Sequence, residues 1–350
     1  MQQSAILLGK YQGCLFGLAI GDALGAPVEF ITLDEIKRRY GKAGVTDFQP
    51  WNVFNAGSYT DDTQMALATA VGCVSAYQRW LDKGICNPTA VIYRYYKEWF
   101  YSQDIKFNRR APGSTCMEAL SGDEDTMGTL ENKINNSKGN GGVMRMAPAG
   151  LVLATEIAFQ KGAEFAAITH SHPSGYLSAG FLAQVIAYIK LKKSLNEAIE
   201  LSIKKLKQYD GFEETLGCIE QAITLSKTML LAEDAIAQIG SGLTGEQALG
   251  ISLYCALKFR NNWVKGVLAS VNHSGDSDTT GAITGAILGA LLGIKLIPTQ
   301  WILNVENSKV INKIATDMFD LFTGKIQELS RRDRFYYITG IYYNDIYKEN

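Results

Sequence analysis

The stretch "GCLFGLAIGDALGAPVEF", residues 13–30, carries a glycine at every fourth position from Gly13 to Gly25. A second stretch near the other end of the chain, "GAITGAILGALLG", residues 281–293, repeats this spacing. Four-residue spacing places the glycines of each stretch on one face of a helix. A glycine inside a helix costs up to about 1 kcal/mol relative to alanine, so eight of them require a compensating gain. Close approach of two backbones is such a gain, and we predict that these two helices pack against each other through their glycine faces.

Helical periodicity extends over most of the chain, which has 350 residues but only seven prolines, and the alternation typical of β-strands is scarce. No linker or break in composition divides it. We therefore predict one all-α domain over residues 1–350, with residues 331–350 as a tyrosine-rich C-terminal extension. The predicted helices cover residues 8–24, 61–83, 88–101, 155–168, 175–208 (one helix or two), 213–230, 245–259, 278–294 and 305–328. Three predicted loops cover residues 102–115, 121–142 and 168–176.

The composition favours a large core and argues against nucleic acid as a partner. Hydrophobic residues make up 47% of the chain and charged residues 20%, and the formal net charge is −1, without a basic stripe. The six cysteines are scattered without a C-x-x-C pair, which argues against zinc and suits a reducing compartment. The first residues do not form a secretory signal, and the apolar run at residues 281–294 is too short to cross a bilayer comfortably. We expect a soluble, cytoplasmic protein without a membrane partner.

Two short segments place acidic residues and a threonine at the start of a predicted helix. In "GSYTDDTQMALATA", residues 57–70, these are Thr60, Asp61 and Asp62. Such side chains are common helix N-caps, because their oxygens accept hydrogen bonds from the free N–H groups of the first turn. A cap needs only one of them, however, and adjacent carboxylates repel each other unless a cation lies between them. Taken alone, the segment suits a cap better than a metal site.

The second segment changes that balance. In "NHSGDSDTTGAITG", residues 272–285, Asp276, Asp278 and Thr279 begin the second glycine-rich helix. The spacing of an EF-hand is absent, and oxygen ligands of this kind select Mg²⁺, Mn²⁺ or Ca²⁺ rather than zinc. Four converging carboxylates would suit a two-metal site. We therefore favour metal binding over two independent caps.

A glycine-rich loop and three histidines are further candidates. In "SKGNGGVMRMAPAG", residues 137–150, a bare turn at residues 139–142 precedes a helix and offers N–H groups to phosphate. An ordinary glycine loop is the alternative, since the sequence is neither a P-loop nor a dinucleotide-binding fingerprint. His170, His172 and His273 all lie in or beside the candidate segments. A single histidine is more often structural, but this distribution favours a shared cleft.

Five segments, in order along the chain, resemble the signature blocks of the ADP-ribosylglycohydrolase family. They are "GCLFGLAIGDALGAPVEF" (13–30), "SYTDDTQM" (58–65), "GNGGVMRMAPAG" (139–150), "THSHPSGYLSAG" (169–180) and "HSGDSDTTGAITGAILG" (273–289). The resemblance spans nearly the whole chain. It implies an all-α fold of mostly orthogonal helices with a binuclear magnesium centre.

The same resemblance implies roles for individual residues. The implied metal ligands are Thr60, Asp61, Asp62, Asp276, Asp278 and Thr279, for two Mg²⁺ ions with Mn²⁺ as a possible substitute. Glu29 matches the family's acidic residue near the scissile bond and is the candidate to position or deprotonate the attacking water. The catalytic candidates are therefore Glu29, Asp61, Asp62 and Asp276. The implied substrate contacts are Ser137, Gly139, Asn140, Gly141, Gly142, His170 and Tyr176, together with Gly113 and Ser114 from the loop "RRAPGST".

Members of this family act on different ADP-ribose linkages. The motifs look closest to those of ADP-ribosylarginine hydrolases, which include the glycohydrolases that reactivate nitrogenase reductase. The resemblance implies cleavage of the bond between ribose C1″ and an arginine guanidinium, with an oxocarbenium-like transition state. The partners would be an ADP-ribosylated protein, the product ADP-ribose and, if the chain serves as an immunity protein, a cognate ADP-ribosylating toxin. The alternatives are ADP-ribosyl-serine or O-acetyl-ADP-ribose as substrate, or an immunity protein that acts mainly by binding its toxin.

The C-terminal extension, "RRDRFYYITGIYYNDIYKEN", contains five tyrosines and one phenylalanine. Aromatic residues are enriched at interfaces, but burial against the protein's own core is the more common fate of such residues. We favour burial and keep an oligomer or partner surface as the alternative.

Overall fold

The computed structural model describes residues 2–105 and 108–325, and this part of the chain is helical without a β-strand. Two isolated bridges, Trp51–Phe54 and Gly139–Thr244, are its only β-type pairings. The α-helices are α1 (Gln2–Gly25), α2 (Leu33–Tyr40), α3 (Asp61–Lys83), α4 (Pro88–Ser102), α5 (Ser114–Ser121), α6 (Ala147–Val152), α7 (Thr155–Ala167), α8 (Pro173–Lys190), α9 (Leu195–Leu206), α10 (Glu213–Ser226), α11 (Ala232–Ile239), α12 (Gly245–Lys258), α13 (Trp263–Val271), α14 (Ser277–Leu292), α15 (Thr299–Asn304) and α16 (Ser308–Phe322). Four 3₁₀-helices join them: η1 (Ala26–Val28), η2 (Glu124–Thr126), η3 (Asn140–Gly142) and η4 (Ile294–Leu296). The predicted all-α fold is confirmed.

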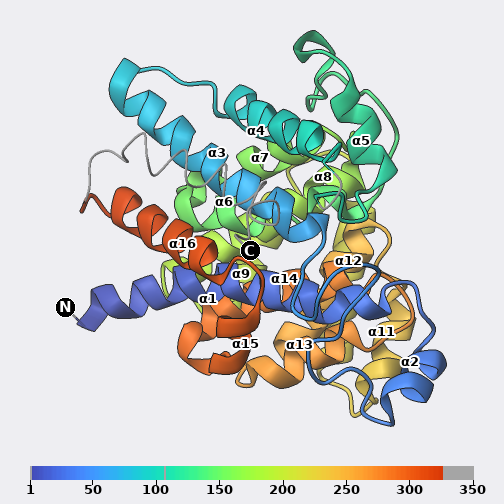
Figure 1. Cartoon of the computed structure of the whole chain (residues 1–350). Helices are drawn as coiled ribbons and strands as arrows, with labels where there is room; N and C mark the ends of the chain where they lie inside the picture. Colours follow the sequence, from blue (N-terminus) through green and yellow to red (C-terminus); the bar gives the residue numbers. More distant parts are fainter. Residues whose placement is uncertain (1, 106–107, 326–350) are drawn as a thin grey trace.

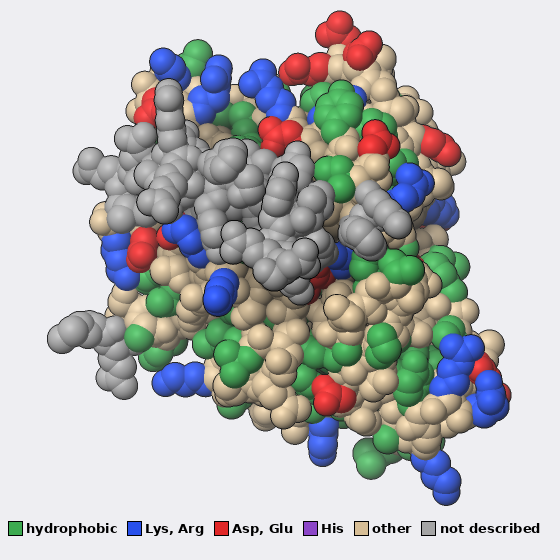
Figure 2. All heavy atoms as spheres, in the orientation of Figure 1, with side chains coloured by type: hydrophobic (Ala, Val, Ile, Leu, Met, Phe, Trp, Pro, Cys, Tyr) green, Lys and Arg blue, Asp and Glu red, His purple; other side chains and the backbone are tan. Residues whose placement is uncertain are grey.

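The helices run in several directions rather than as one parallel bundle (Figure 1). α1 and α14 lie side by side at the centre, with α3 and α4 on one side and α13 and α15 on the other (Figure 1). A single cluster of buried apolar side chains includes residues from α1, α3, α8, α12, α14 and α16. The face in Figure 2 carries scattered acidic and basic side chains rather than one basic stripe, in keeping with the net charge of −1.

The glycine faces of α1 and α14 pack against each other, as predicted. The two helices are antiparallel, so that Gly13 faces Gly289, Gly17 faces Gly285 and Gly21 faces Gly281. A Cβ atom added at any of these six positions would overlap the carbonyl oxygen of the facing glycine. The backbones are therefore in direct contact, which no larger residue would allow.

α1 is also the one helix of the described residues that is long and apolar enough to cross a membrane, by length and composition alone, over Gln3–Val28. The prediction from the sequence rested on the apolar run at residues 281–294 and did not include this helix. A buried core helix passes the same test, and 56% of the apolar window in α1 is buried inside the protein.

Most of the predicted helices are present with small shifts at their ends, but α1 already begins at Gln2 rather than at residue 8, and α16 ends at Phe322 rather than at residue 328. Residues 175–208 form two helices, α8 and α9, separated at Lys192, which has a φ of 65°. α9 begins with a capping box in which Ser194 and Glu197 bind each other's backbone N–H groups. The helix predicted to start at residue 305 begins only at Ser308, because Asn307 adopts a left-handed conformation.

The predicted helix at residues 213–230 is too long. α10 ends at Ser226, and the carbonyl of Thr228 accepts a hydrogen bond from Lys258 Nζ instead of continuing the helix. Six α-helices lie outside the predicted ranges, because each has fewer than ten residues and so too few turns for a clear period; they are α2, α5, α6, α11, α13 and α15. Of these, only α6 was expected in outline, as the helix after the glycine turn. The predicted extension, residues 331–350, lies outside the described residues.

Substitution of one facing glycine tests the central packing. We expect Gly17→Ala to lower the free energy of unfolding by about 2 kcal/mol, because the added methyl group would overlap the backbone of Gly285. Gly217→Ala is the matched control, since Gly217 lies inside α10 with open space around an added Cβ, and alanine should stabilise that helix by up to about 1 kcal/mol. Urea unfolding measures both changes. Equal stabilities for the two variants would contradict the packing argument.

Candidate active site and metal-binding residues

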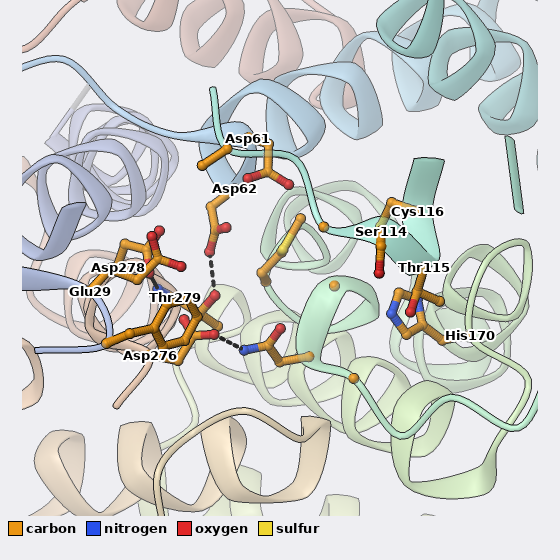
Figure 3. Close-up of a pocket in the computed structure, with 17 residues that line it drawn as sticks. Glu29, Asp61, Asp62, Ser114, Thr115, Cys116, His170, Asp276, Asp278 and Thr279 are labelled. Atoms are coloured by element: carbon orange, nitrogen blue, oxygen red, sulfur yellow. Dashed lines mark hydrogen bonds between the residues drawn. The ribbon is translucent and has the colours of Figure 1, made fainter. Parts of the chain in front are cut away.

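Three helix ends meet at one cavity of about 240 Å³. The C-terminal end of α1 leads through η1 to Glu29, while α3 and α14 both begin at the cavity. Figure 3 shows the acidic side chains on one side of the cavity and His170 with Ser114 and Thr115 on the other. The residues that line it are Glu29, Phe30, Asp61, Asp62, Ala111, Gly113, Ser114, Thr115, Cys116, Gly139, Asn140, Gly141, Met144, His170, Asp276, Asp278 and Thr279.

The start of α3 is held by a buried carboxylate from α1. Thr60 is the N-cap, and its hydroxyl accepts from Asp62 N at 3.3 Å. Asp22 accepts from Thr60 N at 2.8 Å, from Thr63 N at 3.0 Å and from Thr63 Oγ1 at 2.5 Å. Asp22 is not among the site residues predicted from the sequence. Its one signal was that it is the only charged residue in the glycine-spaced run at residues 13–25.

A second buried contact fixes Asp61 from the other side. Asp61 N donates to the carbonyl of Arg110 at 3.0 Å. The Arg110 guanidinium forms a bidentate ion pair with Glu306 at 2.6 and 2.7 Å and lies over the ring of Phe54. The loop before α5 is therefore anchored to the segment between α15 and α16, and it holds the backbone of Asp61 in place.

The start of α14 faces the start of α3 directly. Thr279 Oγ1 donates to Asp62 Oδ1 at 2.8 Å, across more than two hundred residues of sequence. Asn140 Nδ2 donates to Asp276 Oδ2 at 2.9 Å and so joins the glycine loop to the same cluster. Asp276 Oδ1, by contrast, is buried and has no hydrogen-bond partner within the described residues.

These acidic residues are suited to a divalent cation. Carboxylate oxygens of Glu29, Asp276 and Asp278 lie within 4.8 Å of one another. A buried carboxylate oxygen without a donor, such as Asp276 Oδ1, carries a desolvation cost that a cation would offset. Hard oxygen donors of this type are the ligands that Mg²⁺ and Mn²⁺ prefer.

The raised pKa values of the carboxyls in this cluster also favour cation binding. Burial, and then the charges of Asp276 and Asp22, raise the pKa of Glu29 to about 8. Burial raises the pKa of Asp22 to about 6, although hydrogen bonds from Thr63 and Thr60 lower it. Burial followed by neighbouring carboxylates holds the pKa values of three further groups well above their usual range: Asp61, Asp62 and Asp278. Without a cation, the folded protein favours protonated carboxyls here.

The predicted substrate contacts divide into two groups. Gly113, Ser114, Gly139, Asn140, Gly141 and His170 line the cavity, whereas Ser137, Gly142 and Tyr176 do not. Of the predicted metal ligands, Thr60 alone is not part of the lining. Ser137 lies next to the lining residues rather than among them. Its hydroxyl accepts a hydrogen bond from Gly139 N at 3.2 Å and so supports the conformation of the glycine loop. Phe30 was missed: it lies beside Glu29 at the cavity, 60% exposed, with a left-handed φ of 57°.

The shared cleft predicted for the three histidines is wrong for two of them. His172 is the N-cap of α8, where its Nδ1 accepts from Ser174 N at 3.1 Å. His273 is buried, and its Nε2 pairs with Thr280 Oγ1 at 2.9 Å. Only His170 lines the cavity.

The fold and the site define an all-α protein with an acidic cavity formed by helix ends. A family model described as ADP-ribosylglycohydrolase matches residues 3–328. The chain therefore belongs to the ADP-ribosylglycohydrolase family, as its motifs predicted, and the described function of that family is hydrolysis of ADP-ribose linkages.

Several named relatives align along most of the chain at low identity. The ADP-ribosyl-[dinitrogen reductase] glycohydrolase of Rhodospirillum rubrum is 26% identical, over 84% of this chain and 89% of the relative. The ADP-ribosylarginine hydrolase Tri1 of Pseudomonas putida is 27% identical, over 89% and 78%. The ADP-ribosylhydrolase ARH3 of Bos taurus is 24% identical, over 90% and 93%. A solved structure described as an ADP-ribosylglycohydrolase-related protein complex has a TM-score of 0.67 at 22% identity, covering 91% of this chain and 99% of the other, and so shares the fold.

Removal of the Asp22 charge tests its role behind the acidic cluster. We expect Asp22→Asn to weaken Mn²⁺ binding about 10- to 100-fold, because the start of α3 would lose a carboxylate that accepts three hydrogen bonds. Thr32→Val is the control, since it removes the cap of the exposed helix α2, where Thr32 accepts from Glu35 N. Titration calorimetry gives both affinities. An unchanged affinity in a folded Asp22→Asn protein would contradict the positioning role.

The raised pKa values predict how stability depends on pH. The carboxyls of the cavity titrate near pH 4 in an unfolded chain, but in the folded protein they keep their protons to a higher pH. For Glu29, whose pKa is raised to about 8, this range extends to about pH 8. The folded state thus binds more protons between these values, so in EDTA the Tm should fall as the pH rises through this range. Saturating Mg²⁺ should raise the Tm most at the alkaline end.

Calorimetric scans from pH 5 to 8 check this expectation, with Asp278→Asn as the variant that should reduce both effects. A Tm increase on Mg²⁺ addition that is the same at every pH would contradict it.

Proposed function

We propose that this chain is a magnesium-dependent hydrolase that removes ADP-ribose from arginine side chains of modified proteins. The observation that supports it most directly is the hydrogen bond from Thr279 Oγ1 to Asp62 Oδ1, which brings the two acidic helix starts into one cavity. His170 lies on the opposite side of that cavity, and the glycine loop is a further part of the cavity wall. A ribose diphosphate would therefore meet a carboxylate-rich wall and a wall rich in N–H donors.

We assign two Mg²⁺ ions, with Mn²⁺ as a substitute, to the carboxylates of this cavity. The residues that would hold them are Thr60, Asp61, Asp62, Asp276, Asp278 and Thr279. Such ions, when bound, lower the pKa of a coordinated water and orient it. The orphaned Asp276 Oδ1 and the grouped oxygens of Glu29, Asp276 and Asp278 support this assignment.

Glu29 is the residue that we assign to the attacking water. It lies in the same oxygen cluster as Asp276 and Asp278 and follows the rigid η1 turn, so its carboxylate is held at the cavity. In its ionised form it would accept a proton from the water as the bond to C1″ breaks, so that the hydroxyl joins C1″ and the proton passes on to the departing guanidine nitrogen. An oxocarbenium-like transition state at C1″ would be stabilised by the surrounding negative charge.

The glycine loop and its neighbours would hold the diphosphate. Gly139 and Gly141 leave the backbone bare beside the ring of His170, and Asn140 ties the loop to Asp276. Backbone N–H groups in such a turn are suited to anionic oxygens. The Gly113–Ser114 segment begins α5 at the cavity and offers a helix N-terminus to the same ligand.

The arginine linkage rests on the motifs and on the name of the Pseudomonas putida relative. The bovine relative is named only as an ADP-ribosylhydrolase, which keeps ADP-ribosyl-serine and O-acetyl-ADP-ribose as alternative substrates. A cytoplasmic location, a toxin partner and a role in immunity, whether by hydrolysis or by binding, stay predictions from the sequence.

Release of ADP-ribose from an arginine-modified protein tests the proposal. We expect turnover with Mg²⁺. EDTA should lower the rate at least 100-fold because it removes the cation, and Asp62→Asn and Asp276→Asn should do the same because each removes a carboxylate oxygen that binds it. Asp82→Asn is the control, since Asp82 is an exposed acid at the far end of α3. Full activity in EDTA or in either cavity variant would overturn the cation requirement.

The same assay with serine-modified protein and O-acetyl-ADP-ribose decides the linkage. Faster release from either substrate would replace the arginine assignment with the corresponding alternative. Protection of cells from an ADP-ribosylating toxin by Asp62→Asn would support action by binding.

A further inference from the structure

Arg145 is a fully buried cation without a carboxylate partner among the described residues. Its Nη2 donates to Thr169 Oγ1 at 2.6 Å, and its Nη1 contacts the sulfur atoms of Met65 at 3.2 Å and Cys116 at 3.6 Å. The guanidinium carbon lies 4.2 Å from the ring centre of Tyr96, and Nε has no hydrogen-bond partner. Burial of a charge is costly unless it is paired. Packing alone does not account for an arginine here.

Thr169 connects this cation to the cavity. Arginine can only donate hydrogen bonds, so Thr169 Oγ1 is the acceptor of the bond from Arg145. The single hydroxyl hydrogen of Thr169 then has three possible acceptors: His170 Nδ1 at 2.8 Å, the carbonyl of Ala166 at 3.4 Å and the sulfur of Cys116. The nearer of the nitrogen and oxygen acceptors is His170 Nδ1. A ring nitrogen that accepts has no proton, which leaves the ring proton on Nε2.

The other edge of the His170 ring faces the glycine loop. A Cβ atom added at Gly139 would lie 3.1 Å from His170 Nε2, and one added at Gly141 would lie 2.8 Å from Cε1. No described residue forms a hydrogen bond with Nε2, and His170 is part of the cavity wall. Burial, and then the charge of Arg145, lower the pKa of His170 to about 3, so the ring is neutral at pH 7.

We propose that Arg145 and Thr169 form a positioning relay that holds His170 as its Nε2–H tautomer, so that this N–H donates to an anionic oxygen of the ligand beside the glycine loop. The opposite tautomer would present a lone pair to that oxygen and repel it. The identity of the ligand rests on the proposed function, but the relay itself does not. Arg145 acts through Thr169 and touches no ligand atom.

The tautomer can be observed in the free protein. The chain has only three histidines, so labelling with ¹⁵N-histidine gives three rings, which His172→Gln and His273→Gln assign. Long-range ¹H–¹⁵N correlation spectra distinguish the Nε2–H ring from the Nδ1–H ring. We expect His170 to be Nε2–H in the wild type and in Thr169→Ser, and to become Nδ1–H or mixed in Thr169→Val.

Binding of ADP-ribose, measured by calorimetry, provides the functional readout. Thr169→Val should weaken it about 10- to 100-fold, the loss expected for one hydrogen bond to a charged group, and Thr169→Ser should restore it. Thr215→Val is the matched control, because Thr215 is a buried threonine on α10 whose hydroxyl has no partner.

Two results would overturn the relay: an Nδ1–H tautomer of His170 in the wild type, or a Thr169→Val protein whose tautomer is unchanged. Failure of the wild type to bind ADP-ribose would overturn the proposed function instead, while the spectra would still decide the relay.

Discussion

The contact between the glycine faces of α1 and α14 determines where the acidic groups of the cavity lie. The facing pairs extend to the site itself, since a Cβ at Gly25 would overlap the backbone of Asp278. Because the helices are antiparallel, the C-terminal end of α1 lies against the N-terminal end of α14. Asp22 and Glu29 are thereby brought to the aspartates of the distant segment. Wider spacing of the two helices would move these carboxylates apart and open the oxygen cluster.

This packing concentrates negative charge that the protein only partly compensates. The N-termini of α3 and α14 direct partial positive charge toward the cluster, and Asp22 is satisfied by its hydrogen bonds from Thr60 and Thr63. The carboxyl of Glu29 and the free oxygen of Asp276 have no such support. The raised pKa values of Glu29 and Asp276 reflect this uncompensated negative charge. A cluster of this kind is stable either protonated or with a bound cation.

The sequence predicted the parts of the site that repeat a local pattern. Glycine spacing indicated the central helix pair, and the two acidic segments showed their own caps and ligands. Contacts between distant segments left no such pattern. Asp22, Phe30 and the pairing of Arg145 with Thr169 depend on which helix packs beside which, so single residues gave little sign of them. For the histidines, by contrast, the sequence predicted too much. Because the chain has few histidines, a shared cleft was predicted for all three, but His172 binds a local backbone N–H group and His273 binds a threonine hydroxyl.

Under the proposed function, the two walls of the cavity would also make cation binding and ligand binding depend on each other. A diphosphate is an anion, and the carboxylates of Asp62 and Asp276 on one wall would repel it from the N–H donors on the other. A bound cation removes that repulsion, so it should raise the affinity for the diphosphate even where it touches only the ribose. By linkage, the ligand must then tighten the cation to the same degree. His170 fits this arrangement as a neutral donor, because it adds a hydrogen bond for the anion without adding a positive charge that would compete with the cation.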